Sequence, residues 1–109
     1  MKPQQALVFD RFVLDPVAGC LFGPTAALRL TPKAYALLEY LAASPGRLAT
    51  KRELLDALWP HQCVTDGVLK VCVREIRRVL GDDARAPRFI ETAHRRGYRF
   101  VAHHSLTTH

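Results

Sequence analysis

The segment from Thr65 to Val101 constrains the fold of this 109-residue chain more than any other. Its first part, TDGVLKVCVREIRRVLG, repeats apolar residues at helical spacing, and its last part, IETAHRRGYRFV, alternates like two short strands. At about 100° per residue, the apolar side chains of the helix fall on one narrow stripe: Leu69, Val73, Ile76 and Leu80. The basic side chains fall on a second stripe: Lys70, Arg74, Arg77 and Arg78. The segment therefore predicts a basic amphipathic helix followed by a basic β-hairpin.

The positive charge of the chain is concentrated in the same region. The formal net charge is +6. Residues 70–109 carry nine basic and four acidic side chains, a balance of +5, whereas residues 1–69 carry seven and six, a balance of +1. Eight of the nine basic residues are arginine, whose planar guanidinium suits phosphate groups and guanine edges better than a lysine does. A basic helix beside a basic hairpin is therefore expected to contact nucleic acid.

The first half of the chain predicts a small sheet and two helices. Three β-rich runs separated by turn residues predict an antiparallel sheet: Leu7–Asp15, Cys20–Phe22 and Leu28–Leu30. Thr31 and Pro32 provide a hydroxyl cap and a proline at the first helical position, so a helix is expected to begin here and to end at residues 44–46. A capping box from Thr50 to Glu53 predicts a second helix.

Several residues have expected roles at the ends of the later elements. Thr65 or Asp66 is expected to cap the third helix, and Gly81 is expected to end it in the left-handed conformation. Gly97 is expected to take the positive φ of a tight hairpin. The aromatic side chains that follow this glycine are expected to anchor the hairpin in the core.

Composition and motifs argue against a metal, a cofactor or an enzyme. A chain of this length is expected to form one domain with a single core. The three cysteines lack CxxC spacing and are expected to be reduced thiols: Cys20, Cys63 and Cys72. His61 and Cys63 form only an isolated pair of ligand types, and no GxSxG, HExxH or P-loop motif is present. No transmembrane segment or signal peptide is expected, which favours a cytoplasmic location.

Three separated motifs carry a resemblance to a known family: LTPKAYALLEYLAASPGRLATKRELLDALW, VTDGVLKVCVREIRRVLGDD and PRFIETAHRRGYRF. Together they resemble the OmpR/PhoB-type winged helix-turn-helix domain, the transcriptional regulatory protein C-terminal family. The GDD…PRFIET phrasing is most similar to the N-terminal branch of CadC/ToxR-like one-component regulators. The likeness covers residues 7–102, with 1–6 as an N-terminal tail and 103–109 as a C-terminal tail or the start of a linker. It implies an α+β fold: an N-terminal antiparallel sheet, three helices and a C-terminal β-hairpin, the wing.

The resemblance also implies a function. It implies sequence-specific binding of double-stranded DNA by a bacterial transcriptional regulator, with the recognition helix (about 66–80) in the major groove and the wing (about 89–101) on the minor groove or backbone. The residues expected to meet DNA are Lys70, Val71, Arg74, Arg77, Arg78, Thr92, His94, Arg95 and Arg96. Binding as a dimer or tandem pair is expected, and the loop 60–65 could face RNA polymerase. The alternative is a winged-helix protein–protein interaction module without DNA binding.

Some residues depart from the family pattern or leave their roles open. Many relatives place arginine at the position of Glu75. We expect Glu75 to pair with an arginine one turn away, or else to accept from a cytosine amino group. His94 also stands where many relatives have arginine. Val71 is expected either to touch a thymine methyl or to be buried or neutral. Thr92 is expected to donate to a phosphate or to be an ordinary strand residue.

Overall fold

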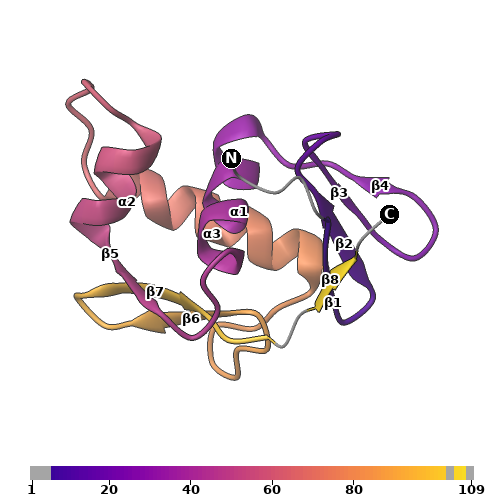
Figure 1. Ribbon diagram of the computed structural model, residues 1–109. Coiled ribbons are helices and arrows are strands. Elements are labelled where there is room, and N and C mark those ends of the chain that lie inside the picture. The colour runs from indigo at the N-terminus through magenta and orange to yellow at the C-terminus, as the bar shows by residue number, and fades with distance from the viewer. Residues whose placement is uncertain (1–5, 103–104, 108–109) are drawn as a thin grey trace.

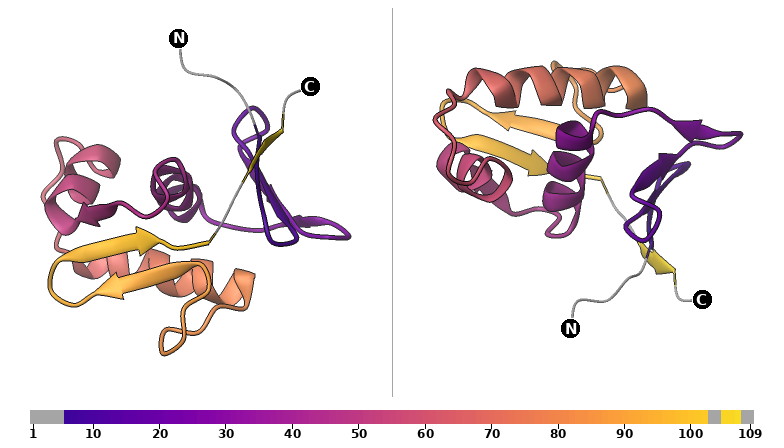
Figure 2. Two further views of the ribbon diagram at one scale, coloured as in Figure 1. Left: turned by 60° about the horizontal axis from the view of Figure 1, so that its bottom comes forward. Right: turned by 90° about the horizontal axis from the view of Figure 1, so that it is seen from above.

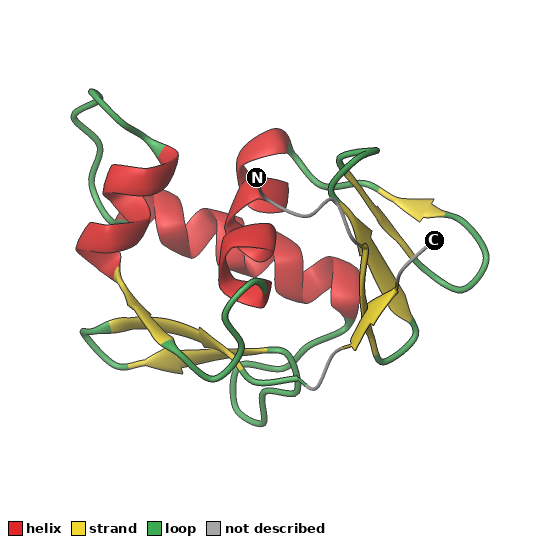
Figure 3. Ribbon diagram, viewed as in Figure 1, coloured by secondary structure: helices red, strands yellow, loops and turns green. Residues whose placement is uncertain are grey.

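Three helices lie between two antiparallel sheets in the computed structural model, which describes residues 6–102 and 105–107 (Figure 1). The N-terminal sheet stands at one side of the helices, and the sheet that contains the wing lies beneath them (Figure 3). This arrangement confirms the predicted α+β winged-helix fold. It also packs the third helix and the β-hairpin wing against the same hydrophobic core.

The N-terminal sheet has five strands in the order β4-β3-β2-β1-β8, and every neighbouring pair is antiparallel. The strands are β1 (Ala6–Phe9), β2 (Phe12–Asp15), β3 (Cys20–Phe22), β4 (Ala27–Leu28) and β8 (Ser105–Thr107). Alternation along β1 and β2 turns Phe9, Phe12 and Leu14 into the core. The predicted antiparallel sheet is present, but the expected run Leu7–Asp15 is two strands, because the chain turns at residues 10–11, where Asp10 has a φ of 54°. β4 also begins and ends earlier than the expected run.

The ends of the chain differ from the expected tails. Ala6 already belongs to β1, and residues 105–107 form β8 rather than the start of a linker. β8 pairs with β1, and Leu7 lies opposite Leu106. A three-residue strand is too short for a recognisable alternation, and it is held by main-chain pairing to a distant strand. The other residues of the expected tails (1–5, 103–104 and 108–109) lie outside the described residues.

The helices are α1 (Pro32–Ala42), α2 (Lys51–Leu58) and α3 (Gly67–Leu80). The predicted caps of the first two are confirmed. The Thr31 hydroxyl accepts from the Ala34 N–H at 3.4 Å. In the capping box, the Thr50 hydroxyl accepts from the Glu53 N–H at 3.1 Å, and the Glu53 carboxylate accepts from the Thr50 N–H at 3.4 Å. Gly81 ends α3 with φ 71°, also as predicted.

The start of α3 differs from the prediction. Asp66 occupies the N-cap position, but its side chain makes no capping hydrogen bond. Instead it accepts from Lys51 Nζ at 3.0 Å, and this hydrogen bond lowers the pKa of the Asp66 carboxyl. The backbone of Asp66 is already helical (φ −68°, ψ −6°), whereas a capping side chain normally requires an extended backbone. The Thr65 carbonyl accepts from the Val68 N–H at 3.2 Å.

The second sheet has three strands in the order β5-β7-β6. They are β5 (Leu48–Thr50), β7 (Gly97–Phe100) and β6 (Ile90–Ala93). The β6–β7 hairpin is the predicted wing. β5 was not predicted, because three residues between two helices carry no alternating pattern. It forms because Ala49 pairs with Tyr98 across the sheet. The wing is therefore held to the helices through β5.

The two sheets share one hydrophobic core. Four aromatic rings meet at their junction with centroid separations of 5.1–5.7 Å: Phe9, Phe12, Phe89 and Phe100. All four are at most 4% exposed. Three of the four ring pairs are edge-to-face, a favourable aromatic geometry. Phe100 and Tyr98 anchor the wing in this core, as predicted.

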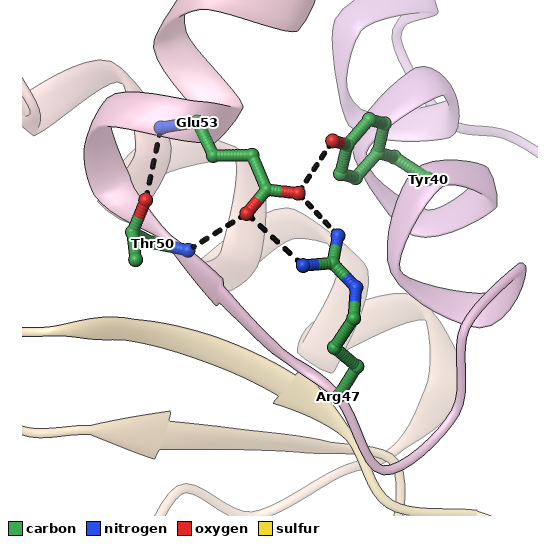
Figure 4. A network of polar contacts seen from close by, with 4 residues as sticks. All are labelled: Tyr40, Arg47, Thr50 and Glu53. Carbon is green, nitrogen blue, oxygen red and sulfur yellow. Dashed lines mark hydrogen bonds and ion pairs between the residues drawn. The ribbon is translucent and has the colours of Figure 1, made fainter.

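A polar network ties α1, β5 and α2 together (Figure 4). The Glu53 carboxylate accepts from the Tyr40 hydroxyl at 2.6 Å and from both terminal nitrogens of Arg47, in addition to its capping contact. The hydrogen bonds from Arg47 and Tyr40 lower the pKa of Glu53 to about 2. One side chain thus completes the α2 cap and joins it to the end of α1.

We expect acid to destabilise the fold through Glu53. Because its pKa in the folded chain is below the ordinary 4.5, this carboxylate contributes stability above that pH, and the contribution is lost as the pH falls toward 2. The network is partly exposed, so the contribution is about 1 kcal/mol or less. Thermal unfolding across this range should show a smaller fall in Tm for Glu53→Gln than for the native chain. Equal falls in the two chains would contradict the assignment.

Candidate nucleic-acid interface

One face of α3 is buried and the opposite face is open to solvent. The buried side chains are Leu69, Cys72, Val73, Ile76 and Leu80. Four side chains form what we call the exposed arc, which spans about 100° of the helix circumference: Lys70, Val71, Arg74 and Arg78. Val71 is 64% exposed, which excludes the buried role considered for it. The exposed arc thus presents three cations, with one apolar side chain beside them at its edge.

Arg77 lies at one flank of the exposed arc and is bonded to the wing. Its Nη2 donates to the Ile90 carbonyl at 2.9 Å and to the Thr92 hydroxyl at 2.8 Å. Its Nε is buried and has no hydrogen-bond partner within the described part of the chain. Arg77 and Thr92 were both predicted to contact DNA. In the structure the two side chains are hydrogen-bonded to each other, and this contact holds the wing against α3.

Glu75 lies at the other flank and contacts α1. Its Oε2 accepts from the Thr31 N–H at 2.6 Å, and its Oε1 accepts from the Thr31 hydroxyl at 2.9 Å. The favoured prediction, a pair with an arginine one turn away, is wrong. The physical reason is that the N-terminus of α1 offers an unpaired N–H and a favourable helix dipole. A carboxylate on this flank of α3 satisfies both.

The wing tip exposes three further residues: His94, Arg95 and Arg96. The Arg96 N–H donates to the Ala93 carbonyl at 2.9 Å, which closes a tight turn. The left-handed residue of this turn is Arg95, with φ 65°, and not Gly97 as predicted. Gly97 is required for another reason. A Cβ at this position would lie 1.9 Å from the Ala49 carbonyl oxygen, so only glycine lets β5 and β7 approach.

Lys51 joins the wing tip to the start of both α2 and α3. Its N–H donates to the Arg96 carbonyl at 3.1 Å, while its side chain pairs with Asp66. Figure 2 shows the β6–β7 hairpin alongside α3, with its tip at the end of the molecule where α3 begins. The exposed wing tip therefore lies at the end of the molecule where α3, which carries the exposed arc, begins.

Asp82 organises the connector from α3 to the wing, a role that the sequence did not reveal. Its Oδ1 accepts from the Arg88 N–H at 2.8 Å and from the Asp83 N–H at 3.0 Å. Its Oδ2 accepts from the Ile90 N–H at 2.9 Å and the Phe89 N–H at 3.3 Å. One carboxylate thus fixes the point where the chain enters β6. The sequence signal that could have indicated this role is the position of Asp82 directly after Gly81, the C-cap of α3.

The cysteines and histidines form no metal-binding arrangement in the described ranges, 6–102 and 105–107. No group of three or more His, Cys, Asp or Glu side chains there could hold a metal ion. Cys72 is buried, and burial raises the pKa of its thiol. No helix in the same ranges has the length and apolarity needed to cross a membrane.

The basic α3, the wing packed against it and the bracing sheet define a winged helix-turn-helix domain. Residues 25–100 match the family model described as "Transcriptional regulatory protein, C terminal". The chain belongs to this family, which confirms the OmpR/PhoB-type resemblance.

The chain is also similar to individual proteins, although it spans only a small part of the first of them. It is 37% identical over 93 residues to the transcriptional regulator HilA of Salmonella typhi, covering 85% of this chain but 16% of HilA. The DNA-binding domain of Klebsiella pneumoniae RstA, solved in complex with the RstA box, is 26% identical with a TM-score of 0.77, covering 90% of this chain and 98% of that one. The DNA-binding domain of Escherichia coli CadC has the same fold, with 24% identity, a TM-score of 0.80 and coverage of 97% and 100%.

Proposed function

We propose that this chain is the sequence-specific, double-stranded DNA-binding domain of a bacterial transcriptional regulator. The observation that carries the proposal is the exposed arc of α3, in which three cations and Val71 face solvent, together with a basic wing tip. Similar domains support it, since the RstA domain was solved on its DNA box. We assign the DNA-binding domain to residues 7–102. Because its proposed target is chromosomal DNA, we propose that the regulator acts in the cytoplasm.

In the proposed complex, α3 enters the major groove. The groove is about 12 Å wide and admits one helix. Lys70 and Arg74 would donate to guanine edges, and Val71 would contact a thymine methyl. Arg78, one turn after Arg74 at the C-terminal end of the exposed arc, would contact phosphate. Arg77 would offer its remaining Nη1 to the same backbone while its Nη2 holds the wing.

The wing would make the second contact. Arg95 and Arg96 project from a closed turn, and His94 is exposed beside them. A narrow minor groove concentrates negative potential, so guanidinium groups are well suited to it. These contacts, together with those of the phosphate-binding arginines on α3, would supply most of the affinity and its salt dependence.

Partners beyond DNA are also proposed. One domain of this size buries a modest interface, so useful affinity would require two copies, as a dimer or tandem pair. The loop 60–65 exposes His61, Gln62 and Cys63 at the end of α2, away from the wing contacts, and we propose that it faces RNA polymerase.

A duplex titration tests the proposal. Fluorescence anisotropy of the chain with a random-sequence duplex at about 50 mM salt should show binding that weakens steeply with salt. Selection of bound duplexes from a random pool should then yield an enriched site. Absence of binding at low salt would contradict DNA binding and favour the alternative, a protein-interaction module.

Replacing Arg74 with alanine should reduce discrimination between sites. We expect affinity for the selected duplex to fall about 10- to 100-fold, the worth of one bidentate base contact. Affinity for random duplex should change about twofold, because only one of several cations is lost. Arg85→Ala is the matched control, since it removes the same charge from the exposed connector. Equal losses on both duplexes would show that Arg74 contacts phosphate alone.

A further inference from the structure

Glu75 is the acidic residue of α3, and both of its carboxylate oxygens are engaged by one residue of another helix. Thr31 donates its N–H and its hydroxyl to separate oxygens of the carboxylate, at 2.6 and 2.9 Å. The Thr31 hydroxyl also accepts from the Ala34 N–H to cap α1. Thr31 therefore couples the start of α1 to the middle of α3 through a two-point contact.

The two flanks of the exposed arc are tied to different elements. Glu75 lies about 140° around the helix from Lys70 on one side, and Arg77 lies about 20° from it on the other. Glu75 is bonded to α1, and Arg77 is bonded to β6. A helix held on both sides of its exposed face has little freedom to rotate about its own axis.

We propose that Glu75 and Thr31 form a positioning pair that sets the rotation of α3, and thereby determines which side chains reach the bases. The inference rests on the proposed DNA-binding function. Recognition requires reading groups to be held within about 0.5 Å and 10–20°. We assign position 75 a positioning role, because both of its carboxylate oxygens are directed at Thr31.

The chemistry of the contact requires a carboxylate. Thr31 presents two donors, and only a carboxylate offers two acceptor oxygens. A glutamine keeps only one acceptor oxygen and carries no charge, so it can accept from one of these donors at most. A negative charge is also favoured at the N-terminus of α1, whereas an arginine would be opposed there. Position 75 thus supports a groove-reading face built from Lys70, Val71 and Arg74 alone.

Binding ratios test the pair. For each variant we would measure Kd on random duplex divided by Kd on the selected duplex. Glu75→Gln and Thr31→Val should lower this ratio about tenfold, comparable to losing recognition of one base pair. Thr31→Ser retains the N–H, the hydroxyl and the cap, and should keep the ratio within about twofold of the native chain. This rescue would not follow from a general loss of stability.

A control separates positioning from stability. Tyr35→Phe removes hydroxyl contacts of α1 to the Asp15 carbonyl and to Glu39, neither of which belongs to α3. It should lower the Tm by a few degrees and leave the binding ratio unchanged. If Glu75→Gln and Thr31→Val also leave the ratio unchanged, or if Tyr35→Phe lowers it equally, the inference is overturned.

Hydrogen exchange tests the contact without DNA. The Thr31 amide should exchange at least about tenfold faster in Glu75→Ala than in the native chain, because its acceptor is lost. Unchanged exchange would overturn the pair. If the native chain fails to bind duplex although Thr31 is protected, the proposed function is wrong while the helix–helix contact stands.

Discussion

Replacing Gly97 with alanine is expected to lower the free energy of unfolding by about 3 kcal/mol or more, because the added methyl has no space. The new Cβ would lie 1.9 Å from the Ala49 carbonyl oxygen and 2.9 Å from Thr50 Cα. Both neighbours are main chain, so no side chain can move aside. Relief requires β5 and β7 to separate, which would also break the Lys51 contact to the wing tip. We therefore expect DNA binding to fall together with stability.

Urea denaturation of matched alanine variants measures this effect. Gly81 and Gly46 have positive φ and open space around the site of a new Cβ, so alanine there should cost only about 1 kcal/mol of backbone strain. A Gly97→Ala variant no less stable than these two would show that the strands tolerate separation.

Replacing Asp82 with alanine is expected to cost about 2–4 kcal/mol and to detach the wing from its position beside α3. The carboxylate accepts four main-chain N–H groups, and each charge-assisted hydrogen bond contributes more than a neutral one. Two of the donors, on Phe89 and Ile90, belong to buried residues, and water cannot readily replace the lost acceptor there. The entry of the chain into β6 would lose its anchor.

The neighbouring aspartate provides the control. Asp83 is exposed and its carboxylate accepts from one main-chain donor, the Arg85 N–H at 3.0 Å, so Asp83→Ala should cost less than about 1 kcal/mol. Asp82→Asn retains one acceptor oxygen and should be intermediate. Chemical denaturation, followed by hydrogen exchange of the Ile90 amide, distinguishes the three chains. Similar stabilities for the two alanine variants would contradict the role of Asp82.

Elements with strong local signals were predictable from the sequence. The proline start of α1, the capping box of α2 and the glycine end of α3 act within one turn of chain, so their residue types identify them. The exposed arc was predictable for a similar reason, because amphipathic spacing is a local property.

Features that depend on distant partners were not predictable. Glu75 bonds to Thr31, 44 residues earlier, and nothing in the surrounding helix indicates this partner. The Asp66 side chain does not cap α3 as expected, because it accepts a hydrogen bond from Lys51 instead. Lys51 is 15 residues away in sequence and comes close to Asp66 only in the folded chain. A glycine was correctly expected to be required at position 97, but the predicted reason, a positive φ in the turn, was wrong. Glycine is required because the main chain of β5 leaves no space for a Cβ.

The junction of four phenylalanines sets a lower limit on the length of chain that can fold. The family match begins at residue 25, yet four buried core side chains lie before it: Phe9, Phe12, Leu14 and Leu21. A chain trimmed to the matched segment would expose the rings of Phe89 and Phe100 to water, at about 25 cal/mol for each Å² of apolar surface. The segment that matches the family model is therefore shorter than the segment needed to cover Phe89 and Phe100, the core residues on which the wing packs.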